Sequence, residues 1–307
     1  MEEKVKLDLK RIFGFSQFRG NQELIVDNLL NNRNTFVIMP TGAGKSLCYQ
    51  LPAILLDGLT LVVSPLIALM KDQVDVLLAR GIAAARLDST LAAAEVAEVY
   101  ERMLNGTLKL LYVAPERFVS ETFVARIKRA KIGLLAIDEA HCISEWGHNF
   151  RPEYLRLAAL AKKFRIKRVL ALTATATPPV VAEICAGFRI KKKDCVQTSF
   201  LRRNLAMHIT PVSAEQRLPL LTQKLTASAH IPAIVYVTLQ HTAESVAGHL
   251  QKAGLRARAY HAGMANEVRA SVQDDFMSGR SDVIVATIAA ATTATATVDT
   301  VYYFDIE

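Results

Sequence analysis

Short apolar runs alternate with longer amphipathic stretches from residue 35 to residue 187 of the chain. The apolar runs predict strands at 35–39, 60–64, 84–87, 109–113, 132–138 and 167–173. The amphipathic stretches predict helices at 45–56, 66–80, 91–104, 116–128, 153–164 and 178–187. This order of elements is typical of a parallel sheet with helices on both faces, so we expect an α/β domain here.

A basic, polar stretch at 189–204 interrupts this alternation. Apolar runs resume after it and predict strands near 232–237, 256–260, 282–286 and 301–306. A chain of 307 residues with 51% hydrophobic residues can build two cores, so we predict one domain at 1–200 and a second at 201–307. The run 289–297 contains only Ala and Thr, and we assign it no chemistry.

The chain is basic, with a formal net charge of +8. Lys and Arg residues gather at 126–129, 162–168, 189–193 and 202–203. The overall excess favours a polyanionic partner such as a nucleic acid backbone. Each cluster by itself is more simply explained as a solvated helix end or loop.

No segment of the sequence indicates a membrane or secreted protein. The longest apolar region, 47–70, is interrupted by Pro52, Asp57 and Pro65, which hydrocarbon does not tolerate. The N-terminus has no apolar signal segment, so we expect a cytoplasmic, nucleoid-associated protein. The four cysteines form no Cys-x-x-Cys pair, and we therefore expect free thiols and no zinc site.

A glycine-rich octapeptide, Met39–Ser46, lies between an apolar run and the start of a predicted helix. Strand, glycine-rich loop and helix in this order are typical of a phosphate-binding loop, although Met39 replaces the usual first glycine. Backbone N–H groups of Thr41, Gly42, Ala43 and Gly44 would converge on the phosphate oxygens. Lys45 would reach the terminal phosphates, and Ser46 would bind Mg²⁺.

A second candidate site follows the predicted strand 132–138, which ends in the adjacent carboxylates Asp138 and Glu139. Open α/β sheets bind ligands at the carboxyl ends of their strands. Asp138 would hold Mg²⁺ through water, and Glu139 would orient and deprotonate the attacking water in phosphoryl transfer. Without the phosphate loop, a strand that ends in a solvated acidic turn would be an equally good interpretation.

Further segments resemble, in order, the motifs of RecQ-type DNA helicases of superfamily 2. These segments are Phe13–Gln22, Ser64–Val74, Tyr112–Phe118, His141–Tyr154, Ala171–Thr177, Ile234–Glu244 and Ala259–Met264. The resemblance implies an α/β fold of two RecA-like parallel-sheet lobes with helices on both faces, the second lobe incomplete. It also implies ATP and Mg²⁺ as cofactors, single-stranded and partially duplex DNA as partners, and single-strand-binding or repair proteins as further partners.

The same resemblance assigns roles to individual residues. Gln22 would bind both exchangeable edges of adenine, with Arg19 alongside the base, because a glutamine amide offers one donor and one acceptor. Contact with DNA, or coupling to it, is implied for Ser64, Lys71, Arg117, His141, Trp146, Phe150, Arg151, Thr173, Thr175, Thr238 and His261. Trp146 and Phe150 would stack on bases, although they could instead be core aromatics, and His261 could be a packed or capping residue.

The chain also departs from the family pattern. Glu145 and Asn149 stand where the family more often has glutamine and aspartate. After 282–287 the expected glycine-rich continuation is replaced by the Ala/Thr run, and the family's Gln-x-x-Gly-Arg-x-Gly-Arg motif is not in the sequence. Since the arginines of that motif reach the γ-phosphate in the family, we expect this chain to bind ATP but to hydrolyse it poorly.

The leading hypothesis from sequence is an ATP-dependent DNA helicase that moves 3′ to 5′ on single-stranded DNA and unwinds duplexes in repair or recombination. The main alternative is a nucleotide-gated DNA-binding module or accessory subunit with little ATP turnover. An RNA helicase shares the same core chemistry, and only the resemblance of the aromatic segment after His141 argues against it.

Overall fold

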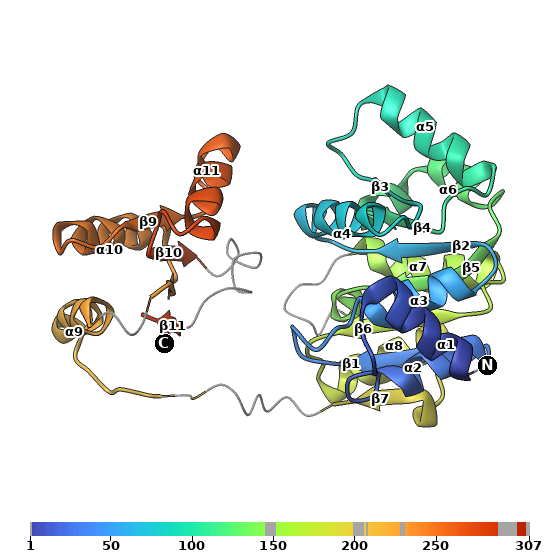
Figure 1. Cartoon of the computed structure of the whole chain (residues 1–307), viewed down its shortest axis with the longest axis horizontal. Coiled ribbons are helices and arrows are strands. Elements are labelled where there is room, and N and C mark those ends of the chain that lie inside the picture. The colour runs from blue at the N-terminus through green and yellow to red at the C-terminus, as the bar shows by residue number, and fades with distance from the viewer. Residues whose placement is uncertain are drawn as a thin grey trace. The chain divides into compact units, whose positions relative to one another are not determined.

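The computed structural model describes residues 2–144, 152–198, 206, 208–227, 231–287 and 300–304. The chain divides into two compact units, residues 1–204 and residues 205–307 (Figure 1). We describe each unit by itself.

Unit 1 contains a seven-stranded parallel sheet in the order β3-β4-β2-β5-β6-β1-β7. Its strands are β1 (Thr35–Ile38), β2 (Leu59–Val63), β3 (Ala84–Leu87), β4 (Leu110–Val113), β5 (Ile132–Ile137), β6 (Val169–Thr173) and β7 (Cys195–Gln197). Its helices are α1 (Glu2–Asp8), η1 (Leu9–Phe13), α2 (Gln22–Leu30), α3 (Leu47–Leu55), α4 (Ile67–Ala79), α5 (Ala93–Leu104), η2 (Pro115–Val119), α6 (Glu121–Ile127), η3 (Ala140–Ile143), α7 (Pro152–Lys163), α8 (Pro178–Phe188) and η4 (Lys192–Asp194).

Helices cover both faces of this sheet, and each face has its own apolar core. Successive side chains of β1 alternate between the two cores, with Phe36 and Ile38 in one and Val37 in the other, as the two-residue period of a strand requires. The first core is completed by α5, α6, α7 and α8. The second is completed by α1, η1, α2, α3 and α4. All the strands are parallel, so the loops that follow their carboxyl ends lie at one edge of the sheet.

Unit 2 contains a four-stranded parallel sheet in the order β11-β8-β10-β9. Its strands are β8 (Ala233–Val237), β9 (Ala257–Tyr260), β10 (Val283–Thr287) and β11 (Thr300–Tyr303). Helices α9 (Ala214–Thr226) and α10 (Gln240–Lys252) pack on one face, and α11 (Asn266–Met277) packs on the other. The α/β class with two parallel-sheet lobes is therefore confirmed.

Several boundaries differ from the sequence-based prediction. The predicted helix 116–128 is two elements, η2 and α6, because the Ser120 hydroxyl accepts a hydrogen bond from the Phe123 backbone N–H (3.3 Å) and begins a new helix. The basic stretch after residue 189 contains β7, where no strand is predicted. The Ala/Thr run lies outside the described residues. No described helix is long and apolar enough to cross a membrane.

Candidate functional site

The glycine-rich loop follows β1 and ends where α3 begins, as predicted. Gly42 and Gly44 have φ angles of 81° and 83°, a left-handed conformation that a residue with a β-carbon adopts only at a cost. The Leu47 N–H donates to the Gly44 carbonyl (3.2 Å), so the first turn of α3 grows directly out of the loop. The positive end of the helix dipole therefore lies at the loop, which favours an anion.

Gln22, at the start of α2, braces this loop. Its Nε2 donates to the carbonyl oxygens of Ala43 (3.2 Å) and Gly44 (3.1 Å), and its Oε1 accepts from the Arg19 N–H (2.9 Å). A β-carbon on Gly44 would lie 2.4 Å from Nε2, so only glycine lets the amide approach this closely. The Arg19 guanidinium stacks over the exposed Phe15 ring, 5.8 Å from its centre. Adenine recognition by Gln22 stays a prediction, and it would require Gln22 to exchange these hydrogen bonds.

Asp138 and Glu139 follow β5 at the same edge of the sheet. Asp138 is 8% exposed, and its Oδ1 accepts from the Glu139 N–H (3.0 Å). Burial, together with the neighbouring Glu139 charge, raises the pKa of Asp138 to about 6, although the Lys45 charge acts in the opposite direction. Burial also acts to raise the pKa of Glu139, but the hydrogen bond with His141 and the charge of Lys45 hold that pKa below its ordinary value. The Lys45 charge thus acts to lower the pKa of both carboxylates.

His141 connects the acidic pair to the adjacent strand β6. Its Nδ1 lies 3.3 Å from the Glu139 carboxylate and 2.8 Å from the Thr173 hydroxyl oxygen. Because that hydroxyl donates to the Thr175 carbonyl (2.8 Å), it accepts from His141, and Nδ1 carries the proton. Contacts with Cys142 and with Glu139 raise the pKa of His141 to about 9. His141 and Thr173 therefore form one hydrogen-bonded unit with Glu139.

A buried polar network behind the loop was not predicted from sequence. The Gln50 Nε2 on α3 donates to the Gln73 Oε1 on α4 (2.9 Å) and to the Tyr112 hydroxyl on β4 (3.3 Å). The Tyr49 ring packs edge-on against Tyr112, with ring centres 6.2 Å apart. This network joins α3, the helix that follows the loop, to α4 and β4, and its one sequence signal is a glutamine in the otherwise apolar helix α3.

The DNA-contact candidates of unit 1 follow β2, β4 and β6, at the same edge as the glycine-rich loop. Ser64 is buried, and its hydroxyl has no hydrogen-bond partner among the described residues. Lys71 is exposed on α4, and Thr175 is exposed after β6. The Arg117 guanidinium donates to the Asp88 carbonyl, so it is held against the loop that follows β3. Trp146, Phe150 and Arg151 lie outside the described residues.

In unit 2, Thr238 and His261 follow β8 and β9 at the carboxyl edge of that sheet. His261 is 4% exposed, and its Nε2 lies 3.3 Å from the Glu244 carboxylate. A β-carbon on Gly263 would lie 2.4 Å from the Gln240 Oε1, so this turn is tightly packed. This packing favours a structural role for the His261 ring, whereas Thr238 is exposed.

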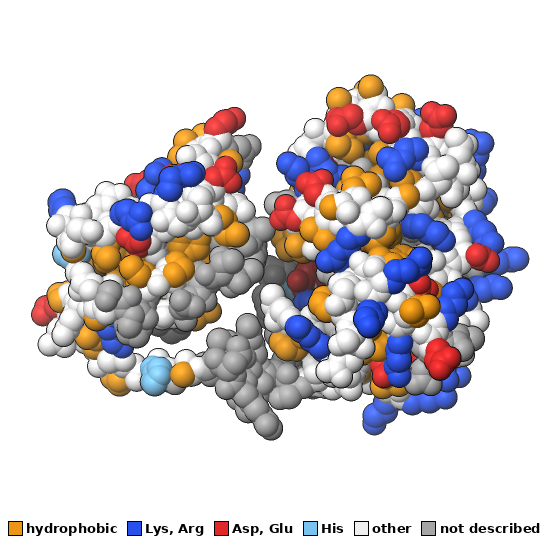
Figure 2. All heavy atoms as spheres, in the orientation of Figure 1, with side chains coloured by type: hydrophobic (Ala, Val, Ile, Leu, Met, Phe, Trp, Pro, Cys, Tyr) orange, Lys and Arg blue, Asp and Glu red, His pale blue; other side chains and the backbone are white. Residues whose placement is uncertain are grey.

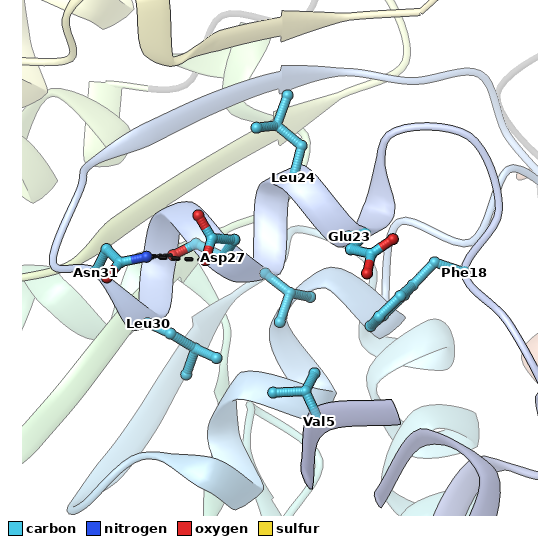
Figure 3. Close-up of a pocket in the computed structure, with 8 residues that line it drawn as sticks. Val5, Phe18, Glu23, Leu24, Asp27, Leu30 and Asn31 are labelled. Carbon is cyan, nitrogen blue, oxygen red and sulfur yellow. Dashed lines mark hydrogen bonds between the residues drawn. The ribbon is translucent and has the colours of Figure 1, made fainter. Parts of the chain in front are cut away.

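A separate pocket of about 560 Å³ lies over α1 and α2 (Figure 3). Val5, Phe18 and Leu30 line it together with Glu23 and Asp27. It contains no residue of the phosphate loop or of the acidic pair, so it is not part of the site described above.

Comparisons with known proteins identify the family of the chain. Residues 19–184 match the DEAD/DEAH box helicase family, and residues 216–307 match the helicase conserved C-terminal domain. The chain is 43% identical to the ATP-dependent DNA helicase RecQ of Haemophilus influenzae over 281 residues, covering 92% of this chain and 45% of that relative. It is 41% identical to the Bacillus subtilis RecQ over 283 residues, covering 92% and 48%. The chain thus spans less than half the length of these curated relatives.

Solved structures support the fold. The Mycobacterium smegmatis helicase Lhr, bound to single-stranded DNA and AMP-PNP, matches with a TM-score of 0.62 at 22% identity, covering 90% of this chain and 40% of that one. The Pyrococcus furiosus Hef helicase domain matches with a TM-score of 0.62 at 14% identity, covering 94% and 90%.

Proposed function

Since the chain belongs to the DEAD/DEAH box helicases and matches RecQ-type members over most of its length, we propose that it is a DNA-stimulated ATPase that drives 3′ to 5′ movement on single-stranded DNA and unwinding of duplex DNA. The single observation that carries the proposal is that the glycine-rich loop after β1 and the acidic pair Asp138–Glu139 after β5 lie at the same carboxyl edge of one parallel sheet. We also propose the two lobes, 1–200 and 201–307, as the units that the motor moves.

The site fits a magnesium triphosphate. Among the described residues, no group of three or more His, Cys, Asp or Glu side chains could hold a metal ion. Mg²⁺ needs no such cage, because it usually keeps several waters and binds one or two carboxylates plus substrate phosphates. Ser46 and Asp138 would supply the protein ligands, and the ion would neutralise charge on the phosphate oxygens.

The protein groups have distinct tasks in hydrolysis. The loop amides and the start of α3 bind the phosphates, and Lys45 offsets their negative charge. Glu139 is the general base: because its pKa is lowered, it is ionised at neutral pH and can accept a proton from the attacking water. Asp138 is largely ionised above about pH 6, and a bound cation would hold it in that form.

DNA contact is proposed for the exposed residues at the carboxyl edges of the two sheets, Lys71, Thr175 and Thr238. A relative by fold, Lhr, is bound to single-stranded DNA in its structure, and this supports the same ligand here. In unit 1, DNA would contact the exposed Lys71 side chain. A change at Thr173 on DNA binding would reach the general base Glu139 through His141, which contacts both residues. Figure 2 shows Lys and Arg side chains spread over the visible face of unit 1 rather than gathered in one patch, so the general basic excess supports a backbone contact only weakly.

The test is phosphate release from ATP with and without single-stranded DNA. We expect Lys45→Ala and Glu139→Gln to lower DNA-stimulated release by about 10² or more, with the second variant still binding nucleotide. Lys4→Ala, which removes an exposed lysine on α1, is the matched control and should leave release unchanged. Unchanged release in Lys45→Ala contradicts the proposal. If ATP tightens DNA binding without any phosphate release, the chain is instead a nucleotide-gated DNA-binding module.

Direction is tested separately. With ATP, the protein should displace streptavidin from a biotin at the 5′ end of a DNA strand and leave one at the 3′ end in place. Displacement from the 3′ end alone would contradict the proposed polarity and leave the proposed ATPase activity unaffected.

A further inference from the structure

Two cysteines face each other at the β7 edge of the unit 1 sheet. Cys185 lies on α8 and Cys195 begins β7, and their Sγ atoms are 3.3 Å apart. Both residues are partly exposed, whereas the other two cysteines, Cys48 and Cys142, are buried. Neither cysteine belongs to the candidate site described above; α8 and β7, which carry them, are labelled in Figure 1.

The hydrogen bonds give the two sulfurs different roles. The Cys195 Sγ donates to the Lys191 carbonyl at 3.6 Å, so Cys185 supplies the proton that lies between the sulfurs. Burial, followed by the hydrogen bond with Cys195, raises the pKa of Cys185 to about 12. While both thiols are reduced, Cys185 holds its proton more tightly than a free thiol does, so Cys195 is the attacking nucleophile and Cys185 acts afterwards as the resolving thiol.

We propose that Cys185 and Cys195 are a site of reversible oxidation, at which an anionic low-molecular-weight disulfide such as oxidised glutathione converts the two thiols to an intramolecular disulfide. Lys191, Lys192 and Lys193 form an exposed turn immediately before Cys195, and their charge suits an oxidant that carries carboxylates. A disulfide bond is about 2.05 Å long, so the sulfurs need to approach by only about 1.2 Å.

The chemistry is two successive thiol–disulfide exchanges. The Cys195 thiolate attacks one sulfur of oxidised glutathione, which forms a mixed disulfide and releases one glutathione that takes up the Cys195 proton. Cys185 then gives up its proton and attacks the Cys195 Sγ, and the second glutathione leaves with that proton. Two protein thiols are oxidised, and one glutathione disulfide is reduced to two thiols.

The sequence between the two cysteines allows a direct test by mass spectrometry. Trypsin cleaves after Arg168, Arg189, Lys193 and Arg202, so Cys185 and Cys195 fall on the separate peptides 169–189 and 194–202. After incubation of the full chain with oxidised glutathione, we expect these peptides to run as one linked species that separates on reduction. The number of alkylatable thiols in denaturant should fall from four, the full cysteine count of the chain, to about two.

Single substitutions and the remaining cysteines are the controls. Cys185→Ser should stop at the mixed disulfide on Cys195, and Cys195→Ser should yield no linked peptide. The peptides that contain Cys48 and Cys142 should stay alkylated in every sample, because these thiols are buried. Four alkylatable thiols after treatment of the wild-type chain would overturn the proposal, and so would a link that joins two chains or involves Cys48 or Cys142. The wild-type peptide map gives this answer even if a variant fails to fold.

Discussion

At the scale of single residues, Glu139 occupies a backbone conformation that is unfavourable for any residue with a side chain. Its φ and ψ angles are 48° and 45°, and the left-handed region costs an L-residue about 1–2 kcal/mol. This turn lets the Glu139 N–H bond to Asp138 while its carboxylate reaches His141. Such strain is retained where the surrounding structure enforces it, and it is common at catalytic sites.

Asp138 leads to a prediction in which stability and function oppose each other. Its pKa is about 6 in the folded chain against 3.8 for the free group, so the folded state binds the proton more tightly. Protonation of Asp138 therefore stabilises the folded state. This stabilisation is fully present below about pH 4 and is lost as the pH rises through about 6. We therefore expect Asp138→Asn to stabilise the nucleotide-free protein at pH 7.5 by about 1–3 kcal/mol while it abolishes Mg²⁺-dependent ATP hydrolysis.

Urea unfolding at pH 4.0 and pH 7.5 checks this prediction. The difference between wild type and variant should nearly vanish at pH 4.0, where Asp138 is neutral in the wild type. A variant that is less stable than wild type at pH 7.5 would mean that Asp138 is not held as an unfavourable buried charge.

His141 leads to a prediction about the pH dependence of hydrolysis. Its hydrogen bond helps to keep the pKa of Glu139 low, whereas burial acts to raise it. In His141→Ala we expect the acid limb of the kcat profile to move to higher pH, because the general base then takes up a proton more readily. His249→Ala removes an exposed histidine of α10 and should leave the profile unchanged. If the acid limb of His141→Ala stays at the wild-type pH, His141 does not control the pKa of Glu139.

At the scale of elements, helix α3 is held in place by its packing against α4 and β4 and not by an amphipathic pattern. The helix carries the phosphate loop at its start and is apolar all round, except for a glutamine that reaches α4 and β4. Buried polar networks of this kind hold elements in a defined arrangement when every member has a partner. Helices α3 and α4 are thus linked by a hydrogen bond as well as by apolar contact.

A double-mutant cycle measures this link. Gln50→Leu leaves the Gln73 and Tyr112 oxygens without their donor, and we expect it to cost about 1–3 kcal/mol of unfolding free energy. Gln73→Leu in the Gln50→Leu background should cost less than Gln73→Leu alone, with a coupling of about 1 kcal/mol. Additive effects would show that the two side chains do not act together. Gln17→Leu, at an exposed position before α2, is the matched control.

At the scale of the whole molecule, the basic charge of the chain predicts how DNA binding depends on salt. A net charge of +8 attracts a polyanion. The logarithm of Kd for single-stranded DNA should therefore rise linearly with the logarithm of the salt concentration. Lys71→Ala, at an exposed position on α4, should lower the magnitude of this slope by about 0.7 if Lys71 contacts one phosphate. Lys4→Ala should leave the slope unchanged, and equal slopes in all three proteins would remove Lys71 from the DNA-contact set.

Sequence alone was sufficient for the elements and residues that local physics determines. Strands β1 to β6 were predicted because their apolar runs are continuous, and the position of the glycine-rich loop between a strand and a helix was predicted because its glycines stand in a fixed order there. The acidic pair was found for the same reason, since it follows a buried strand directly. Such signals reside within a few consecutive residues, so they survive without knowledge of the fold.

Tertiary structure alone decided which distant residues meet. No local sequence pattern encodes the contacts between four pairs of residues: His141 with Thr173, Gln50 with Gln73, Gln22 with Gly44, and Cys185 with Cys195. Strand β7 was missed because it has only three residues in a charged stretch, and its pairing with β1 makes it a strand. The physical reason is the same in each case: strand order and helix packing set these distances, and burial then sets the charge that each group carries.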